Sequence, residues 1–123
     1  MSEFMMQLPD NCPPDVASQR ELVVYRIVKT NPPTLDDFKT HAQLGLAPHV
    51  DYCRRCSLSL FDSYSNAMHR LNLSPKLGAH VAQATLTPAH GLISPVNKAG
   101  HMEWWAYKGK VMPDEFTVSD DEY

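Results

Sequence analysis

Residues 21–28 have the sequence ELVVYRIV, and this short stretch decides the class of fold. Its β-branched and aromatic residues predict a buried β-strand. The KTNPP sequence that follows ends the strand, because proline lacks a backbone donor and biases the preceding residue away from helix. Arg26 lies inside this strand. A buried arginine must reach carboxylates, carbonyls or a bound anion, whereas an edge-strand arginine would point to solvent.

The rest of the chain predicts two short helices and several more strands. Residues 34–45 are expected to form a helix that starts at Thr34 and ends at Gly45, and residues 63–73 a helix capped by Ser63. Residues 46–55 are expected to form a loop. Further strands are expected at 56–61, 78–86, 92–96, 101–107 and 115–119. This order predicts a small α+β domain with a mixed or mostly antiparallel sheet.

The length and composition indicate a single globular domain. The chain has 123 residues, of which 43% are hydrophobic, so it can bury a core. We expect residues 1–20 to form an irregular, loosely attached lead-in. The domain is expected at 21–119, and an acidic, frayed tail at 120–123.

Charge and hydropathy limit the partners. The net charge of -3 lacks the basic excess typical of nucleic-acid-binding proteins, so no nucleic-acid partner is expected. No apolar run approaches the roughly 20 residues of a membrane helix, so no membrane partner is expected. The N-terminus has no basic region followed by an apolar stretch, and we therefore expect a cytoplasmic protein.

Cys53 and Cys56 form a C-x-x-C pair within YCRRCSLS, residues 52–59. Such a pair can supply two zinc ligands, and His41, His49 and His101 are candidates for the others. No second C-x-x-C or H-x-x-x-H sequence completes the set, so we predict no metal site and expect Cys56 to pack inward. Three cysteines in a chain of this length also do not predict a disulfide framework.

Three sets of polar residues are candidates for a functional site. They are Arg26 on the first strand, Ser57 and Ser59 on one face of the second, and His101 before two tryptophans. A histidine there could bind a ligand or transfer a proton. Each candidate also has a structural explanation: an edge-strand arginine, a solvated strand face and a loop histidine.

Four segments in order resemble a group of small bacterial proteins whose activity is not known. The segments are VVYRIVKTNPPTLDDF, CSLSLFDSYSNAM, KLGAHVAQATL and GHMEWW, and the resemblance covers roughly residues 22–118. Because the activity of this group is not known, the resemblance implies little about function.

The arginine-bearing strand, followed by a serine-bearing strand that leads into a helix, also resembles the opening of the ADP-ribosyltransferase fold. This resemblance implies NAD as the cofactor, with Arg26 on its phosphates and Ser57 and Ser59 on the strand that shapes the nicotinamide pocket. Tyr25 or a tryptophan would stack on the nicotinamide or adenine ring. Arg26, Ser59 and His101 would line one cleft as the catalytic residues.

The resemblance also calls for a carboxylate late in the chain, because an oxocarbenium-like transition state needs a nearby negative charge. Glu103 and Glu115 are the nearest candidates, and neither stands in a clear catalytic motif. The chain is also short for this fold. We therefore treat an NAD-dependent transferase or toxin-type domain as a hypothesis and leave open whether the protein is an enzyme.

Two alternatives remain open. Trp104, Trp105 and Tyr107 could form an aromatic surface that binds a protein partner. Adjacent residues on a strand point to opposite faces, so one tryptophan is expected in the core and the other exposed. A structural zinc domain using Cys53 and Cys56 is the third possibility. The partner is thus a nucleotide or a protein, and the sequence predicts no oligomeric state.

Overall fold

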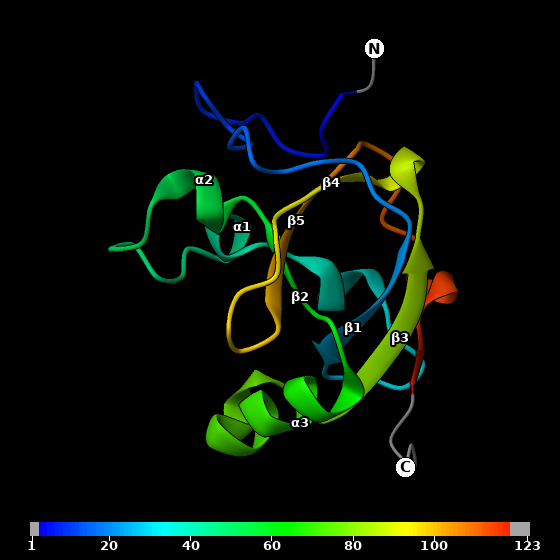
Figure 1. Cartoon of the computed structure of the whole chain (residues 1–123). Helices are drawn as coiled ribbons and strands as arrows, with labels where there is room; N and C mark the ends of the chain where they lie inside the picture. Colours follow the sequence, from blue (N-terminus) through cyan, green and yellow to red (C-terminus); the bar gives the residue numbers. More distant parts are fainter. Residues whose placement is uncertain (1–2, 119–123) are drawn as a thin grey trace.

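The computed structural model describes residues 3–118, and within them a single six-stranded sheet (Figure 1). The strands are β1 Leu22–Val28, β2 Leu58–Phe61, β3 His80–Leu86, β4 Gly91–Ile93, β5 His101–Ala106 and β6 Thr117–Val118. They lie in the order β4-β5-β2-β1-β3-β6, and every neighbouring pair is antiparallel. This confirms the α+β class with an antiparallel sheet. The expected tail at 120–123 and the last residue of the expected 115–119 strand lie outside the described residues.

The helices differ from the prediction in two places. α3 Tyr64–Leu73 begins after Ser63, whose hydroxyl accepts from the Asn66 amide at 3.1 Å, as expected. The single helix expected at 34–45 is instead a 3-10 turn at Leu35–Phe38 followed by α1 His41–Leu44. The prediction was also wrong at 46–55, which contains α2 Tyr52–Arg55. A helix of four residues is too short to show a periodic apolar pattern.

The two faces of the sheet carry separate apolar clusters. The larger one includes Val24, Val28 and Leu58 and lies on the face away from α3. The smaller one joins Phe61 on β2 to Ala67 and its neighbours on α3. α3 therefore covers one end of one face, which Figure 1 shows below the sheet. The rest of that face holds the polar residues described below. No helix within residues 3–118 is long and apolar enough to cross a membrane.

The sheet is nearly split between β1 and β2. β1 pairs with β3 along its whole length, from Leu22–Leu86 to Val28–His80, but with β2 only at Tyr25–Phe61. Arg26 bridges this gap. Its Nη1 donates to the Ser59 carbonyl at 2.8 Å, and its Nε and Nη2 donate to the Asp37 carbonyl at 3.1 and 2.8 Å. The guanidinium thus links β1 to β2 and to the 3-10 turn at Leu35–Phe38 and satisfies two backbone carbonyls.

Residues 3–20 are attached to the sheet at several points, whereas a loosely attached lead-in was expected; residues 1 and 2 of that expectation lie outside the described residues. The Met5 amide donates to the Ala106 carbonyl at 3.0 Å, and Ser18 and Ile93 exchange backbone hydrogen bonds of 3.0 and 2.8 Å. A disulfide joins Cys12 to Cys53, with their Cα atoms 5.6 Å apart. The small, odd number of cysteines did not predict this bond, because pairing between two cysteines 41 positions apart depends on how the fold brings them together.

Both tryptophans are buried, so the expectation of one exposed tryptophan was wrong. Trp104 is 0% exposed and belongs to the larger apolar cluster, and Trp105 on the opposite face is 1% exposed. The indole N–H of Trp105 donates to the Cys53 carbonyl at 2.9 Å, beneath α2. Neither indole therefore offers a surface anchor for a protein partner, and Tyr107, the third residue of the expected aromatic surface, is half-buried.

Candidate functional site

A row of polar side chains lies on the α3 side of strands β2 and β5. Ser59 is the direct partner of Glu103, and Phe61 is the direct partner of His101. Alternate residues of a strand share a face, and Phe61 packs against α3, so Ser59, Glu103 and His101 all lie on that face. We call Ser59, His101, Glu103 and the neighbouring Arg54 the polar row.

The turn before β5 fixes the position of His101. The Asn97 side-chain oxygen accepts hydrogen bonds from the amides of Ala99 and His101, each at 2.9 Å. Gly100 has a φ of +77°, and a Cβ there would meet the Asn66 side-chain nitrogen at 2.2 Å. Only glycine can therefore make this turn without strain and without displacing the side chains of Asn66 and Asp62. The turn presents His101 Nε2 at 3.0 Å from Ser59 Oγ.

The environment of His101 favours its neutral form. Burial lowers the pKa of His101, the charges of Arg54 and Arg70 lower it further, and Glu103 opposes them. The ring also contacts Phe61 edge-on, with centroids 5.4 Å apart. Ser59 itself is exposed. An exposed hydroxyl next to a neutral imidazole can exchange protons with a ligand near neutral pH.

Arg54 and Glu103 form the other half of the polar row. Arg54 Nε lies 2.8 Å from Glu103 Oε2, with the arginine side chain 59% exposed and the glutamate 18% exposed. The hydrogen bond and charge of Glu103 raise the pKa of Arg54. α2 holds Arg54 in place, because the Asp51 carboxylate accepts from the Arg54 amide at 3.3 Å. The glutamate is thus oriented, while more than half of the arginine side chain remains exposed.

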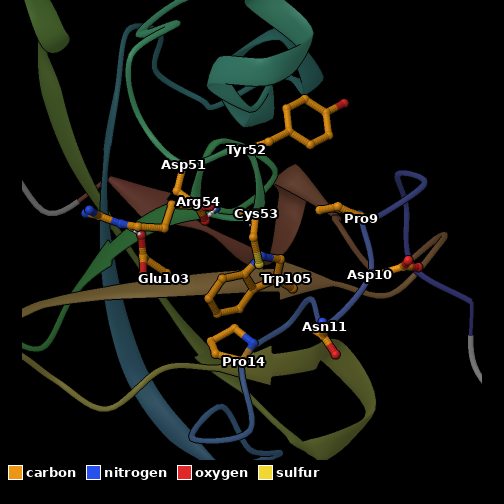
Figure 2. A pocket seen from close by; sticks show the side chains of 10 residues that line it. All are labelled: Pro9, Asp10, Asn11, Pro14, Asp51, Tyr52, Cys53, Arg54, Glu103 and Trp105. Carbon is orange, nitrogen blue, oxygen red and sulfur yellow. Dashed lines mark hydrogen bonds and ion pairs between the residues drawn. The ribbon is translucent and has the colours of Figure 1, made fainter.

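A pocket of about 500 Å³ opens beside Glu103 (Figure 2). It lies between α2 and the N-terminal segment, with Trp105 and the Cys53 sulfur at its centre. Its walls are Pro9, Asp10, Asn11, Pro14, Asp51, Tyr52, Cys53, Arg54, Glu103 and Trp105. This volume falls within the range of small-molecule sites, which is roughly 300–1,000 Å³. The pocket and the polar row share Glu103 and Arg54.

The structure places Arg26 away from this site. Its neighbours at alternate positions, Val24 and Val28, belong to the larger apolar cluster, so Arg26 faces the opposite side of the sheet. Its guanidinium is 5.2 Å from the Phe38 ring centroid, and the residue is only 9% exposed. Burial lowers the pKa of Arg26 to about 10, against the charge of Asp37. The expectation that Arg26, Ser59 and His101 line one cleft is therefore wrong. Arg26 contacts Ser59 only by donating to the Ser59 backbone carbonyl.

The other candidates have mixed outcomes. The Ser57 hydroxyl donates to the Arg54 carbonyl at 2.7 Å and so supports the end of α2. Tyr25 lies on the α3 side, half-buried against the smaller apolar cluster. Glu115 lies 3.0 Å from His90 Nε2, and Glu103 is the carboxylate next to Ser59.

The cysteines of the C-x-x-C pair have different fates. Cys53 forms a disulfide with Cys12. Cys56 is a buried free thiol, as expected. Within residues 3–118, no three histidine, cysteine or acidic side chains gather closely enough to hold a metal ion. The zinc hypothesis therefore lacks its central ligand, because Cys53 is not a free thiolate.

Sequence reasoning missed Arg54 as part of the site. In the sequence it is one of two adjacent arginines between cysteines, which is typical of a solvated surface turn. Only the β2–β5 register and the position of α2 bring it to Glu103.

Comparison with protein-family models, curated proteins and solved structures finds no match.

Proposed function

We propose that this chain is an ADP-ribosyltransferase-like domain that binds NAD at the polar row and breaks its nicotinamide–ribose bond. One observation carries the proposal: Glu103 lies directly opposite Ser59, beside a pocket of about 500 Å³. The resemblance described above requires a serine on the second strand and a carboxylate late in the chain. The direct pairing of Ser59 with Glu103 on one face of the sheet supports the proposal.

The chemistry depends on a carboxylate close to the ribose. As the glycosidic bond breaks, its electron pair leaves with nicotinamide, and positive charge develops on the ribose. In this proposal Glu103 stabilises that charge and accepts a proton from the attacking acceptor, which is water or a hydroxyl of another macromolecule. His101, held 3.0 Å from Ser59 Oγ, orients the serine hydroxyl toward the ligand. A prearranged negative group is effective because it does not need to reorganise during the reaction.

The phosphate contact is assigned to Arg54 instead of Arg26. A guanidinium binds phosphate oxygens through two parallel hydrogen bonds, which requires an accessible edge. The Arg54 side chain is 59% exposed beside the pocket, whereas the Arg26 nitrogens are already bonded to carbonyls in the core. Arg26 is then a positioning residue that holds the strand carrying Ser59.

Thermal unfolding with NAD, ADP-ribose or nicotinamide tests the binding part. A ligand that binds only the folded state raises the melting temperature. We expect NAD and ADP-ribose to raise it for the wild type and for Glu115→Gln, a carboxylate variant at a different place. Arg54→Met should abolish most of the shift. The absence of any shift for the wild type with saturating NAD would refute the proposal.

A further inference from the structure

We propose that the Cys12–Cys53 disulfide is a redox-sensitive latch, whose reduction releases residues 7–17 from one wall of the pocket. Its influence on NAD binding rests on the proposed function, whereas the latch itself does not. The proposal stands on three features: how the segment is attached, where the bond lies and how accessible its sulfurs are.

The disulfide is the central attachment of this segment. On one side, Met5 is bonded to Ala106, and the Met6 sulfur accepts from the Thr40 hydroxyl at 3.1 Å. On the other side, Ser18 pairs with Ile93. Within the described part of the chain, no hydrogen bond or ion pair joins residues 7–17 to the rest of the molecule. Between its two ends the segment is therefore held by the disulfide and by packing alone.

The bond lies at the pocket. Pro9, Asp10, Asn11 and Pro14 from the segment and Cys53 from α2 are all pocket walls. Figure 2 shows the Cys53 sulfur next to Trp105, between the segment and Glu103. A movement of residues 7–17 would thus widen the pocket beside Glu103 without disturbing the strands.

The α2 side of the latch has other attachments. The Asp51 carboxylate caps α2, and the Trp105 indole N–H donates to the Cys53 carbonyl at 2.9 Å. Loss of the disulfide should therefore free the N-terminal segment and leave α2, with Arg54, in place. The disulfide is therefore needed to hold the N-terminal wall of the pocket but not the α2 wall.

The redox step needs a dithiol reductant. Cys12 and Cys53 are both half-buried, which leaves a partial approach for a thiolate. One thiolate of the reductant attacks a sulfur of the bond to give a mixed disulfide, and the second thiol displaces the remaining cysteine. In total, Cys12 and Cys53 gain two electrons and two protons, and the dithiol becomes a disulfide.

Hydrogen–deuterium exchange on the whole chain tests the latch. The samples are oxidised protein, protein reduced with dithiothreitol, and the double variant Cys12→Ser/Cys53→Ser with and without dithiothreitol. We expect reduction to speed exchange of the Ser18 and Ile93 amides, which donate to each other's carbonyls where the segment ends, by at least about tenfold and to leave β1 and β3 unchanged. The double variant should match the reduced protein and should not respond to dithiothreitol.

Two results would overturn the proposal. Unchanged exchange of the Ser18 and Ile93 amides after reduction would show that packing alone holds the segment. Faster exchange throughout β1 and β3 would show that the disulfide is a general staple of the fold, as in many proteins of oxidising compartments. The experiment contains no NAD, so its outcome is independent of whether the transferase proposal holds.

Discussion

Ser59 and Glu103 are direct partners in the β2–β5 ladder, and each has a second polar neighbour. Ser59 Oγ lies 3.0 Å from His101 Nε2, and Glu103 Oε2 lies 2.8 Å from Arg54 Nε. Two strands, a turn and a four-residue helix therefore bring four polar side chains together, and two of them, Arg54 and Glu103, line the pocket. Arg26 lies on the opposite face of the sheet and donates to the Ser59 carbonyl.

Replacement of Arg26 should affect stability more than ligand binding. Arg26→Met leaves the Ser59 and Asp37 carbonyls without their donor, and we expect a loss of about 2–4 kcal/mol in the free energy of unfolding. Arg26→Lys should lose less stability than Arg26→Met, because lysine keeps a charged donor. It should still lose some, because lysine lacks the planar guanidinium. Urea unfolding measures both variants. Unchanged stability together with lost NAD binding would show that Arg26 contacts the ligand instead.

Asp37 should make the free energy of unfolding depend on pH. Burial alone would raise the pKa of Asp37, but hydrogen bonds from Thr30, Thr34 and Lys29 outweigh it and lower the pKa. The folded state therefore binds this proton more weakly than the unfolded state. The resulting stabilisation is complete above the unfolded pKa of about 3.9 and disappears as the pH falls through the folded value.

Asp37→Asn tests this expectation. At pH 7 the variant should be less stable than the wild type by about 1–3 kcal/mol, because the amide cannot accept all three hydrogen bonds. The difference in urea midpoint should shrink as the pH falls below about 4. A difference that is the same at pH 3 and pH 7 would contradict the assigned cause.

The His101 ring should titrate below the ordinary value of about 6.5. Burial is the largest cause, so every folded variant should keep a lowered pKa. Arg54→Met and Arg70→Met should each raise the pKa toward the ordinary value, and Glu103→Gln should lower it further. NMR titration of the ring protons measures all four proteins. A pKa that rises in Glu103→Gln would mean that the carboxylate does not act on this ring.

Arg54 should contribute to the affinity for NAD through charge and geometry. Arg54→Met should weaken NAD binding by about 10- to 100-fold, the range for a charge-assisted hydrogen bond to phosphate. Arg54→Lys should recover part of this loss, because lysine keeps the charge. Calorimetric titration with NAD measures both. Equal affinities for the wild type and Arg54→Met would remove Arg54 from the proposed site.

The sequence was most informative where local pattern determines structure. The β-branched run around Tyr25, the Ser63 cap and the strand at 101–107 were predicted close to their final bounds. Arg26 was recognised as a residue that must find carbonyls, carboxylates or an anion, and it binds carbonyls. These features depend on neighbours along the chain or on the cost of burying a charge.

Features that depend on distant residues were missed. The burial of Trp105 involves α2, whose Cys53 carbonyl accepts from the indole N–H, and the disulfide requires Cys12 to reach Cys53. The face on which Arg26 points depends on which cluster surrounds Val24. The pairing of Arg54 with Glu103 depends on the β2–β5 register, which a single sequence does not reveal.

Nicotinamide release from NAD tests the proposed chemistry at its reacting bond. We would measure it by chromatography for the wild type, Glu103→Gln and Glu115→Gln, each confirmed as folded by its thermal transition. The wild type and Glu115→Gln should release nicotinamide at similar rates. Glu103→Gln should be slower by at least about 100-fold, because the transition-state charge loses its carboxylate. Release that is equal in all three, or absent from the wild type, would contradict the assignment of Glu103 and the transferase-like function.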